Sequence, residues 1–143
     1  MHKQTDEQPI SGVANASIGG RILRYQSSIG SNYSHAEFTG SDLSVARLCG
    51  SNLYRANLEQ ANLSGADLRG TNLQAANLKG ANLYKAILSG ANLDRTNLEQ
   101  ASLEGADLRG ARLRYACLKG ADLHGVDLTG ADLYGVDLTD VKY

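Results

Sequence analysis

Large aromatic side chains, proline and cysteine are scarce in this chain of 143 residues, which has no Trp, one Phe, one Pro and two Cys. Aromatic residues make up only 6% of it, too little for a core built on aromatic packing. Cys49 and Cys117 lie far apart, without a second cysteine or a histidine at ligand spacing, so neither a disulfide framework nor a zinc site is indicated.

Two kinds of segment and an excess of either charge are also missing. The opening ten residues lack the apolar stretch of a secretory signal, and no run of about 18 apolar residues could span a bilayer. Lys and Arg number 14 against 15 Asp and Glu, a net charge of −1, whereas nucleic-acid and acidic-membrane binders need a clear basic excess. We therefore expect a cytoplasmic protein with neither nucleic acid nor membrane as its partner.

Leucine occurs with a period of five. All 21 leucines have numbers ending in 3 or 8, and from Leu43 to Leu138 every fifth residue is Leu. From Leu43 onward, the residue two before each Leu is small, usually Ala, and the residue directly before it is mostly Asn or Asp. Residues 31–140 thus form 22 units of the form A(N/D)LxG or A(N/D)Lxx.

A period of five fits neither an α-helix nor a flat strand. In a helix the leucines would spread over all sides, and in a strand successive leucines would point to opposite faces. A chain that turns once per unit can point Leu and Ala inward and stack on itself, as β-solenoids do. The residues therefore predict an all-β solenoid with Asn/Asp and the two residues after Leu on the outside.

Surface charges indicate four units per coil. At an interval of 20, the residues after Leu are Glu59, Lys79, Glu99 and Lys119, which alternate in sign. Residues stacked in one column would pair in this way. An interval of 40 agrees, because residues 55–73 and 95–113 match at 14 of 19 positions.

The A(N/D)LxG units resemble those of the pentapeptide-repeat family, over about three quarters of the chain. The resemblance implies a right-handed quadrilateral β-helix with four units per coil. We expect a disordered tail over residues 1–10, a degenerate or capping first coil over 11–30, and the repeat β-helix over 31–143. In the 11–30 segment Arg21 and Gln26 stand where Ala belongs, and Ser28 where Leu belongs.

No set of residues predicts catalysis. His35 and His124 fall on different sides, and no Ser/His/Asp or Cys/His set converges. Four aspartates near the C-terminus are spread over four sides by their five-residue spacing: Asp122, Asp127, Asp132 and Asp137. The glycines recur as corner residues, so they indicate no phosphate-binding loop. We expect no enzyme, and no cofactor or metal.

The 20-residue coil separates two sides of unlike charge. The basic side, centred on Leu53, Leu73, Leu93, Leu113 and Leu133, has four arginines against two aspartates, a net charge of +2. The adjacent acidic side, with Glu37, Glu59, Glu99, Asp137 and Asp140 against Lys79 and Lys119, has a net charge of −3 and no exposed aromatic residue. Arg and Tyr are enriched at binding hot spots. The candidate binding residues on the basic side are Tyr54, Arg55, Arg95, Arg112, Arg114, Tyr115 and Tyr134.

The C-terminal coil is a second candidate interface. The repeat continues to the last residues, and an uncovered coil presents unpaired backbone groups and an apolar floor. We expect end-to-end homodimerisation through Val136, Leu138, Val141 and Tyr143.

These features favour a non-enzymatic protein-binding or scaffold rod. Some members of the family that the units resemble mimic DNA and protect gyrase, a type II topoisomerase. That alternative calls for a strongly acidic surface, projecting loops and central Phe residues, whereas this chain has a net charge of −1, only Phe38 and no insertion in its 22 units. A regulatory role in bacterial signalling or differentiation is a further alternative, which no residue here separates from the first.

Overall fold

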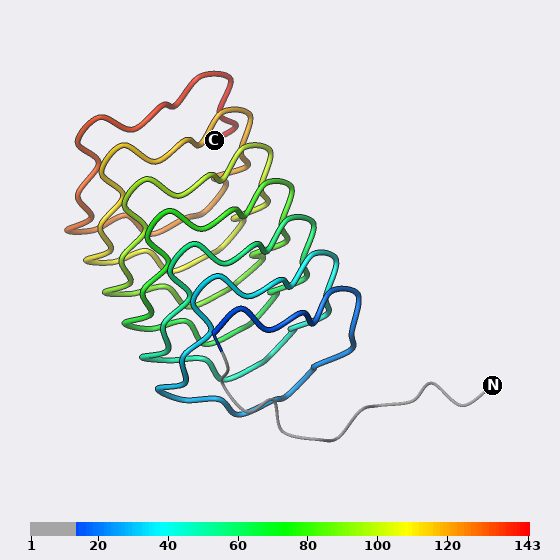
Figure 1. Cartoon of the computed structure of the whole chain (residues 1–143). Coiled ribbons are helices and arrows are strands. Elements are labelled where there is room, and N and C mark those ends of the chain that lie inside the picture. The colour runs from blue at the N-terminus through cyan, green and yellow to red at the C-terminus, as the bar shows by residue number, and fades with distance from the viewer. Residues whose placement is uncertain (1–13) are drawn as a thin grey trace.

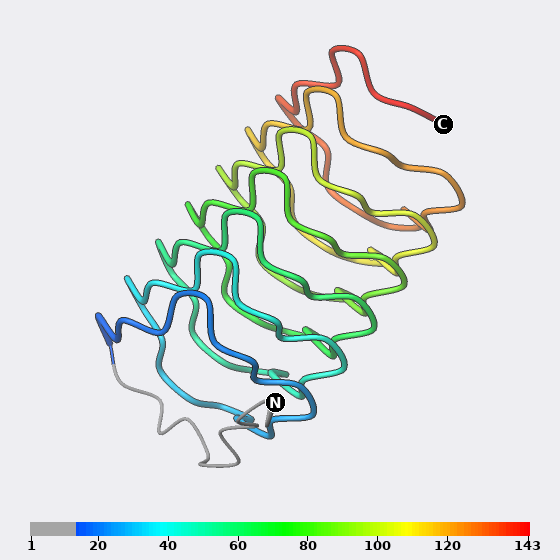
Figure 2. The ribbon, with the colours of Figure 1, turned by 90° about the vertical axis from the view of Figure 1, so that its right-hand side faces the viewer.

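The coils stack into a right-handed quadrilateral β-helix. The computed structural model describes residues 14–143, which make about six and a half coils at 20 residues each, and Figure 1 shows these coils stacked from the N-terminal to the C-terminal end. Figure 2 shows from the side that the stack has no inserted loop. Residues 14–143 contain no helix and no strand longer than one bridge residue per unit. In the part of the chain that the structure describes, no helix is therefore long and apolar enough to cross a membrane.

Parallel backbone bridges fix the register of the coils. Each bridge joins a residue to the residue 20 positions later, as Asn52 pairs with Asn32 below and with Asn72 above. The series runs without a break from Ser17 to Lys142. The prediction of four units per coil is confirmed, and one of the expected column pairs, Lys79 Nζ with Glu99 Oε2, lies at 3.4 Å.

Leucine and alanine fill the interior. Every Leu from Leu23 to Leu118 is at most 1% exposed, as are the alanines two positions before them. Tyr33 and Phe38 occupy two leucine positions, and their rings meet edge to face at 5.4 Å. Where Thr replaces Ala, as at Thr71 and Thr96, its hydroxyl donates to a leucine carbonyl oxygen. The inward position of Leu and Ala is thereby confirmed.

Where Asn or Asp precedes Leu, its side-chain oxygen accepts the one backbone N–H of the unit that the coil-to-coil hydrogen bonds leave without a partner. The N–H groups of Leu53, Arg55 and Asn57 all donate to carbonyls of adjacent coils, but that of Tyr54 does not. Instead it donates to Oδ1 of Asn52, two residues earlier, at 3.1 Å. The same bond recurs with Asn57, Asn62, Asn72, Asn77 and Asn82. A backbone donor left without a partner costs free energy, which explains the residue type at this position.

The two residues after each Leu make a tight turn at a corner. The N–H of Ala56 donates to the carbonyl of Leu53 at 3.0 Å, and the residue between them at the third turn position, Arg55, has a φ of 55°. A positive φ at that position alone defines a type II turn. Fourteen corners use Gly there and twelve use another residue.

The N-terminal end of the described stack keeps this pattern. Residues 14–30 form bridges with the next coil, Ile18 and Leu23 are buried, and Ser28 accepts a hydrogen bond from the hydroxyl of Tyr33 at 2.8 Å. The expected tail over residues 1–10 lies outside the described residues, as do residues 11–13 of the expected first coil.

Candidate binding surface

The corner residues form four columns that run along the stack. One of them, the glycine column, consists of Gly at every coil: Gly30, Gly50, Gly70, Gly90, Gly110 and Gly130. The column that follows the basic side, here called the side-chain column, has residues other than Gly at six successive coils and ends in Gly135; these six are Asn15, His35, Arg55, Ala75, Arg95 and Tyr115. The remaining two columns mix Gly with other residues.

The side-chain column is held in a backbone conformation that disfavours side chains. Its six residues have φ values between 55° and 61°, a left-handed region that costs an L-residue about 1 kcal/mol or more relative to Gly. The glycine column shows that this fold accepts Gly at every coil of a corner. The side chains of this column are therefore kept at a cost in stability, as are six at other corners, but only this column keeps them at six successive coils.

We expect exchanges at two corners to measure this cost. Ala75→Gly should raise the free energy of unfolding by about 0.5–1 kcal/mol, because it relieves the left-handed strain of a residue with almost no side chain to lose. The reverse change in the glycine column, Gly70→Ala, should lower it by a similar amount, since a methyl group there meets no atom within 4 Å and only the backbone strain remains. Denaturant titration measures both, and a destabilising Ala75→Gly would contradict the argument.

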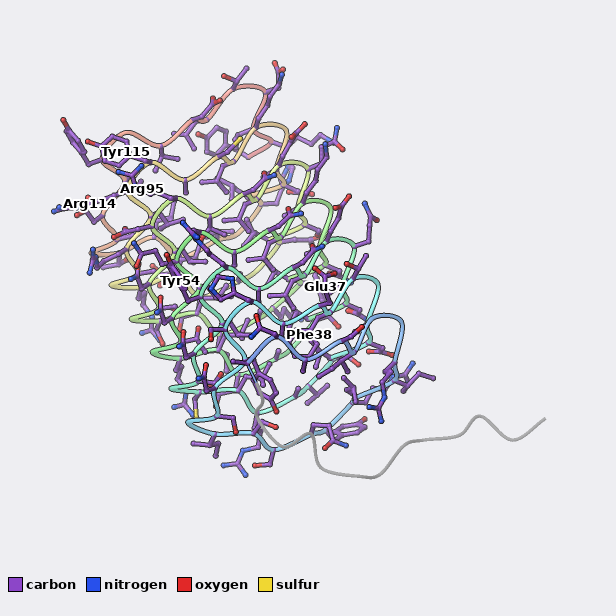
Figure 3. All side chains as sticks on the ribbon, in the orientation of Figure 1. Glu37, Phe38, Tyr54, Arg95, Arg114 and Tyr115 are labelled. Atoms are coloured by element: carbon purple, nitrogen blue, oxygen red, sulfur yellow. The ribbon has the colours of Figure 1, made fainter. Side chains whose placement is uncertain are left out.

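Aromatic and guanidinium groups stack along the basic side. The guanidinium carbon of Arg55 lies 5.3 Å from the ring centroid of Tyr54, and that of Arg95 lies 5.2 Å from the ring of Tyr115. The ring of Tyr134 meets that of Tyr115 edge to face at 5.5 Å. Tyr115 and Tyr134 are 52% and 66% exposed. Figure 3 shows Arg95, Arg114 and Tyr115 gathered at one edge of the stack, with Tyr54 nearer its N-terminal coils.

Two of the four arginines are already paired. Arg112 binds the carboxylate of Asp94, and Nε of Arg114 lies 2.5 Å from Oδ2 of Asp132. The hydrogen bond from Arg114 holds the pKa of Asp132 below its ordinary value, and Asp132 in turn raises the pKa of Arg114. The net charge of +2 on this side therefore resides mainly on Arg55 and Arg95.

Asp94 has a structural role that the sequence pattern does not reveal. Arg112 stands where Asn or Asp normally accepts the N–H two residues later. Here Oδ1 of Asp94, one coil below, accepts the N–H of Arg114 at 3.0 Å, and its other oxygen binds Arg112. Asp94 is only 7% exposed. All seven predicted residues thus lie on one side of the structure. Arg112, however, is bound to Asp94, so its guanidinium is not free to bind a partner.

Titratable groups elsewhere form local pairs. Of the four C-terminal aspartates none bridges another, and Asp127 pairs with Asp107 as the 20-residue interval predicts. The hydroxyl of Thr129 lowers the pKa of Asp127, and the guanidinium of Arg109 lowers that of Asp107. His124 Nδ1 lies 2.6 Å from Asp122. Among the described residues no group of three or more His, Cys, Asp or Glu side chains could hold a metal ion.

The C-terminal coil is less covered than the coils below it. Leu138 is 40% exposed and Tyr143 is 73% exposed, whereas Val136 and Val141 are partly buried against the core. The ladder of coil-to-coil hydrogen bonds from leucine N–H groups ends with Leu123. A homodimer through this coil stays a prediction.

Sequence reasoning missed His35 and Ala75 as members of the candidate surface. Neither belongs to a residue type that marks a binding site when taken alone. The available signal was a run of six coils without Gly along one corner, because Gly is the commonest residue at the corners as a whole. A comparison of corner residues at intervals of 20 would have identified both His35 and Ala75.

Comparison with known proteins agrees with this architecture. The family profile described as "Pentapeptide repeats (8 copies)" matches residues 51–90, 91–130 and 106–142. These matches cover well over half of the chain, so the chain belongs to the pentapeptide-repeat family. A search of curated protein sequences returns no match to the chain.

Three solved structures illustrate the likeness. HetL, a pentapeptide repeat protein involved in heterocyst differentiation regulation in the cyanobacterium Nostoc sp. strain PCC 7120, is 30% identical, with a TM-score of 0.52 over 91% of this chain and 84% of HetL. Another pentapeptide repeat protein of Nostoc PCC 7120 is 37% identical, with a TM-score of 0.56 over 77% of this chain and 84% of that one. A third, from the thylakoid lumen of Arabidopsis thaliana, is 30% identical, with a TM-score of 0.56 over 73% of this chain and 69% of that one.

Proposed function

We propose that the chain is a non-catalytic module that binds another protein through its basic side. The observation that carries this proposal is the side-chain column, where one corner of six successive coils keeps a residue other than Gly in a left-handed conformation. The exposed Tyr and Arg side chains beside it are of the types most enriched at protein-binding hot spots. The β-helix beneath holds them on a rigid scaffold whose core does not use them.

Partner capture tests the proposal. Immobilised wild-type chain should retain a partner from the native lysate, and the variant Arg55→Ala with Arg95→Ala should retain at least tenfold less, because these two arginines carry the free charge of the basic side. The matched control is Arg47→Ala with Lys85→Ala, which removes two cations from other sides and should leave capture unchanged. Equal loss in both variants, or none in the first, would contradict the proposal.

A second candidate function is regulation of cell differentiation through such a protein contact. The likeness to HetL over 91% of this chain favours it. DNA mimicry toward a topoisomerase is less favoured, because the acidic side of this chain is interrupted by Lys79 and Lys119. A gyrase supercoiling assay with and without the chain separates these two alternatives.

A further inference from the structure

Arg55 and Arg95 share a geometry that leaves their hydrogen-bond donors free. Each guanidinium carbon lies over a tyrosine ring, at 5.3 Å for Arg55 over Tyr54 and 5.2 Å for Arg95 over Tyr115. A cation–π contact of this kind uses none of the guanidinium N–H groups as hydrogen-bond donors to an oxygen. Within residues 14–143 neither guanidinium has an ion pair or a side-chain hydrogen bond, in contrast to Arg112 and Arg114. Two oriented, unpaired donors of this kind suit two carboxylates.

The spacing of the two donors is set by the coils. Arg55 and Arg95 occupy the same column two coils apart, which corresponds to about 9.6 Å at about 4.8 Å per coil. Ala75 lies between them and places only a methyl group in the gap. A ligand that reaches both arginines must therefore present its anionic groups on one side and about 10 Å apart.

We propose that the basic side binds an acidic, proline-containing segment of a partner protein in the polyproline II conformation, with two carboxylates three residues apart. This inference rests on the proposed function and names its partner's chemistry. One turn of polyproline II takes three residues and about 9.3 Å, so residues i and i+3 lie on the same side at the required distance. In an extended strand the residues on one side repeat at about 6.8 Å, and residue i+3 points away.

Two further features fit such a segment. The rings of Tyr115 and Tyr134 are exposed beside Arg95, and aromatic surfaces are what proline-rich segments pack against. The adjacent acidic side, with a net charge of −3, disfavours a long polyanion that would extend beyond the basic side. A short acidic peptide meets the two arginines without reaching that side.

Binding of labelled peptides to the full chain tests the proposal. A fluorescein-labelled peptide with the core Glu-Pro-Pro-Glu should bind at least tenfold more tightly than one with Gln-Pro-Pro-Gln, and about fivefold more tightly than one with Glu-Pro-Glu. Fluorescence anisotropy measures the affinities, and they should weaken as salt is raised. Equal affinity for the three peptides would overturn the proposal, as would tighter binding of a helical acidic peptide or of a single-stranded oligonucleotide.

A pair of variants at Ala75 gives the sharpest control. Ala75→Glu places a carboxylate between the two arginines, and it should weaken binding of the Glu-Pro-Pro-Glu peptide at least tenfold. Ala75→Gln has the same size and the same left-handed backbone, and it should bind within about twofold of wild type. Equal binding by the two variants would overturn the proposal. If no peptide binds although Arg55→Ala with Arg95→Ala still abolishes partner capture, the proposed function stands and this inference falls.

Discussion

Leu78→Ala should lower the free energy of unfolding by about 2–5 kcal/mol. Leu78 is fully buried in the middle of the stack, between Leu58 below and Leu98 above. Truncation removes the transfer free energy of the side chain and opens a cavity that the neighbouring coils cannot fill without breaking their register. Denaturant titration followed by circular dichroism measures the loss.

The matched control lies in the same column of the last coil. Leu138 is already 40% exposed, so Leu138→Ala should cost less than about 1 kcal/mol. Equal midpoints for wild type and Leu78→Ala would refute the stacked-leucine core. Equal losses of unfolding free energy in Leu78→Ala and Leu138→Ala would show that a feature other than leucine burial limits the stability of the stack.

Among the charged residues of the basic side, Asp94→Ala should be the most damaging change, with a loss of about 1–3 kcal/mol. It removes the acceptor of the Arg114 N–H, which lies 3.0 Å from Asp94 Oδ1, and it leaves Arg112 without its carboxylate. The Arg114 N–H, which is partly buried, would then lack its partner, and this costs part of its desolvation free energy. Thermal and denaturant unfolding of the variant measure this effect.

A second substitution should repair the first. Arg112→Asn restores the usual residue two positions before Arg114, as Asn92 accepts the N–H of Asp94 at 3.0 Å one coil earlier. The double variant Asp94→Ala with Arg112→Asn should therefore recover most of the lost stability, a coupling that a double-mutant cycle measures. Additive losses would contradict the assignment of Asp94 as a substitute for the missing Asn.

The sequence alone predicted the architecture because one rule governs each position of the unit. A leucine every fifth residue excludes helix and flat strand, and the alternation of Glu59, Lys79, Glu99 and Lys119 indicates four units per coil. These are local and periodic signals, and the backbone bridges confirm them. Right-handedness came from the resemblance to the family, because spacing is the same for either hand.

The candidate site was predicted only in outline. Charge counting placed Arg55, Arg95, Arg112 and Arg114 on one side, and the structure agrees. Charge counting could not distinguish the four arginines from one another. The carboxylate that each arginine contacts depends on the directions of side chains in two coils. Only the structure shows that Asp94 and Asp132 bind two of them and that the other two lie over tyrosine rings.

The backbone conformation gives evidence about the candidate surface that residue composition alone does not. Residues of the side-chain column could be Gly without loss of the fold, as Gly135 in the same column and the glycine column at the preceding corner indicate. The buried core, the hydrogen bonds between coils and the corner turns thus account for most residue types in the 20-residue coil. None of them requires Arg55 or Arg95. Residues that the fold does not need, and that lower its stability, are the best candidates for binding a partner.

Site-specific photo-crosslinking tests the central claim most directly. A photoreactive phenylalanine analogue placed at Ala75, between the two free arginines, should form a covalent adduct with the partner in native lysate. The same analogue at Ser89, on the side that leads into the glycine column, should form none. An adduct from Ser89 alone, or equal adducts from both positions, would show that the partner does not bind the basic side.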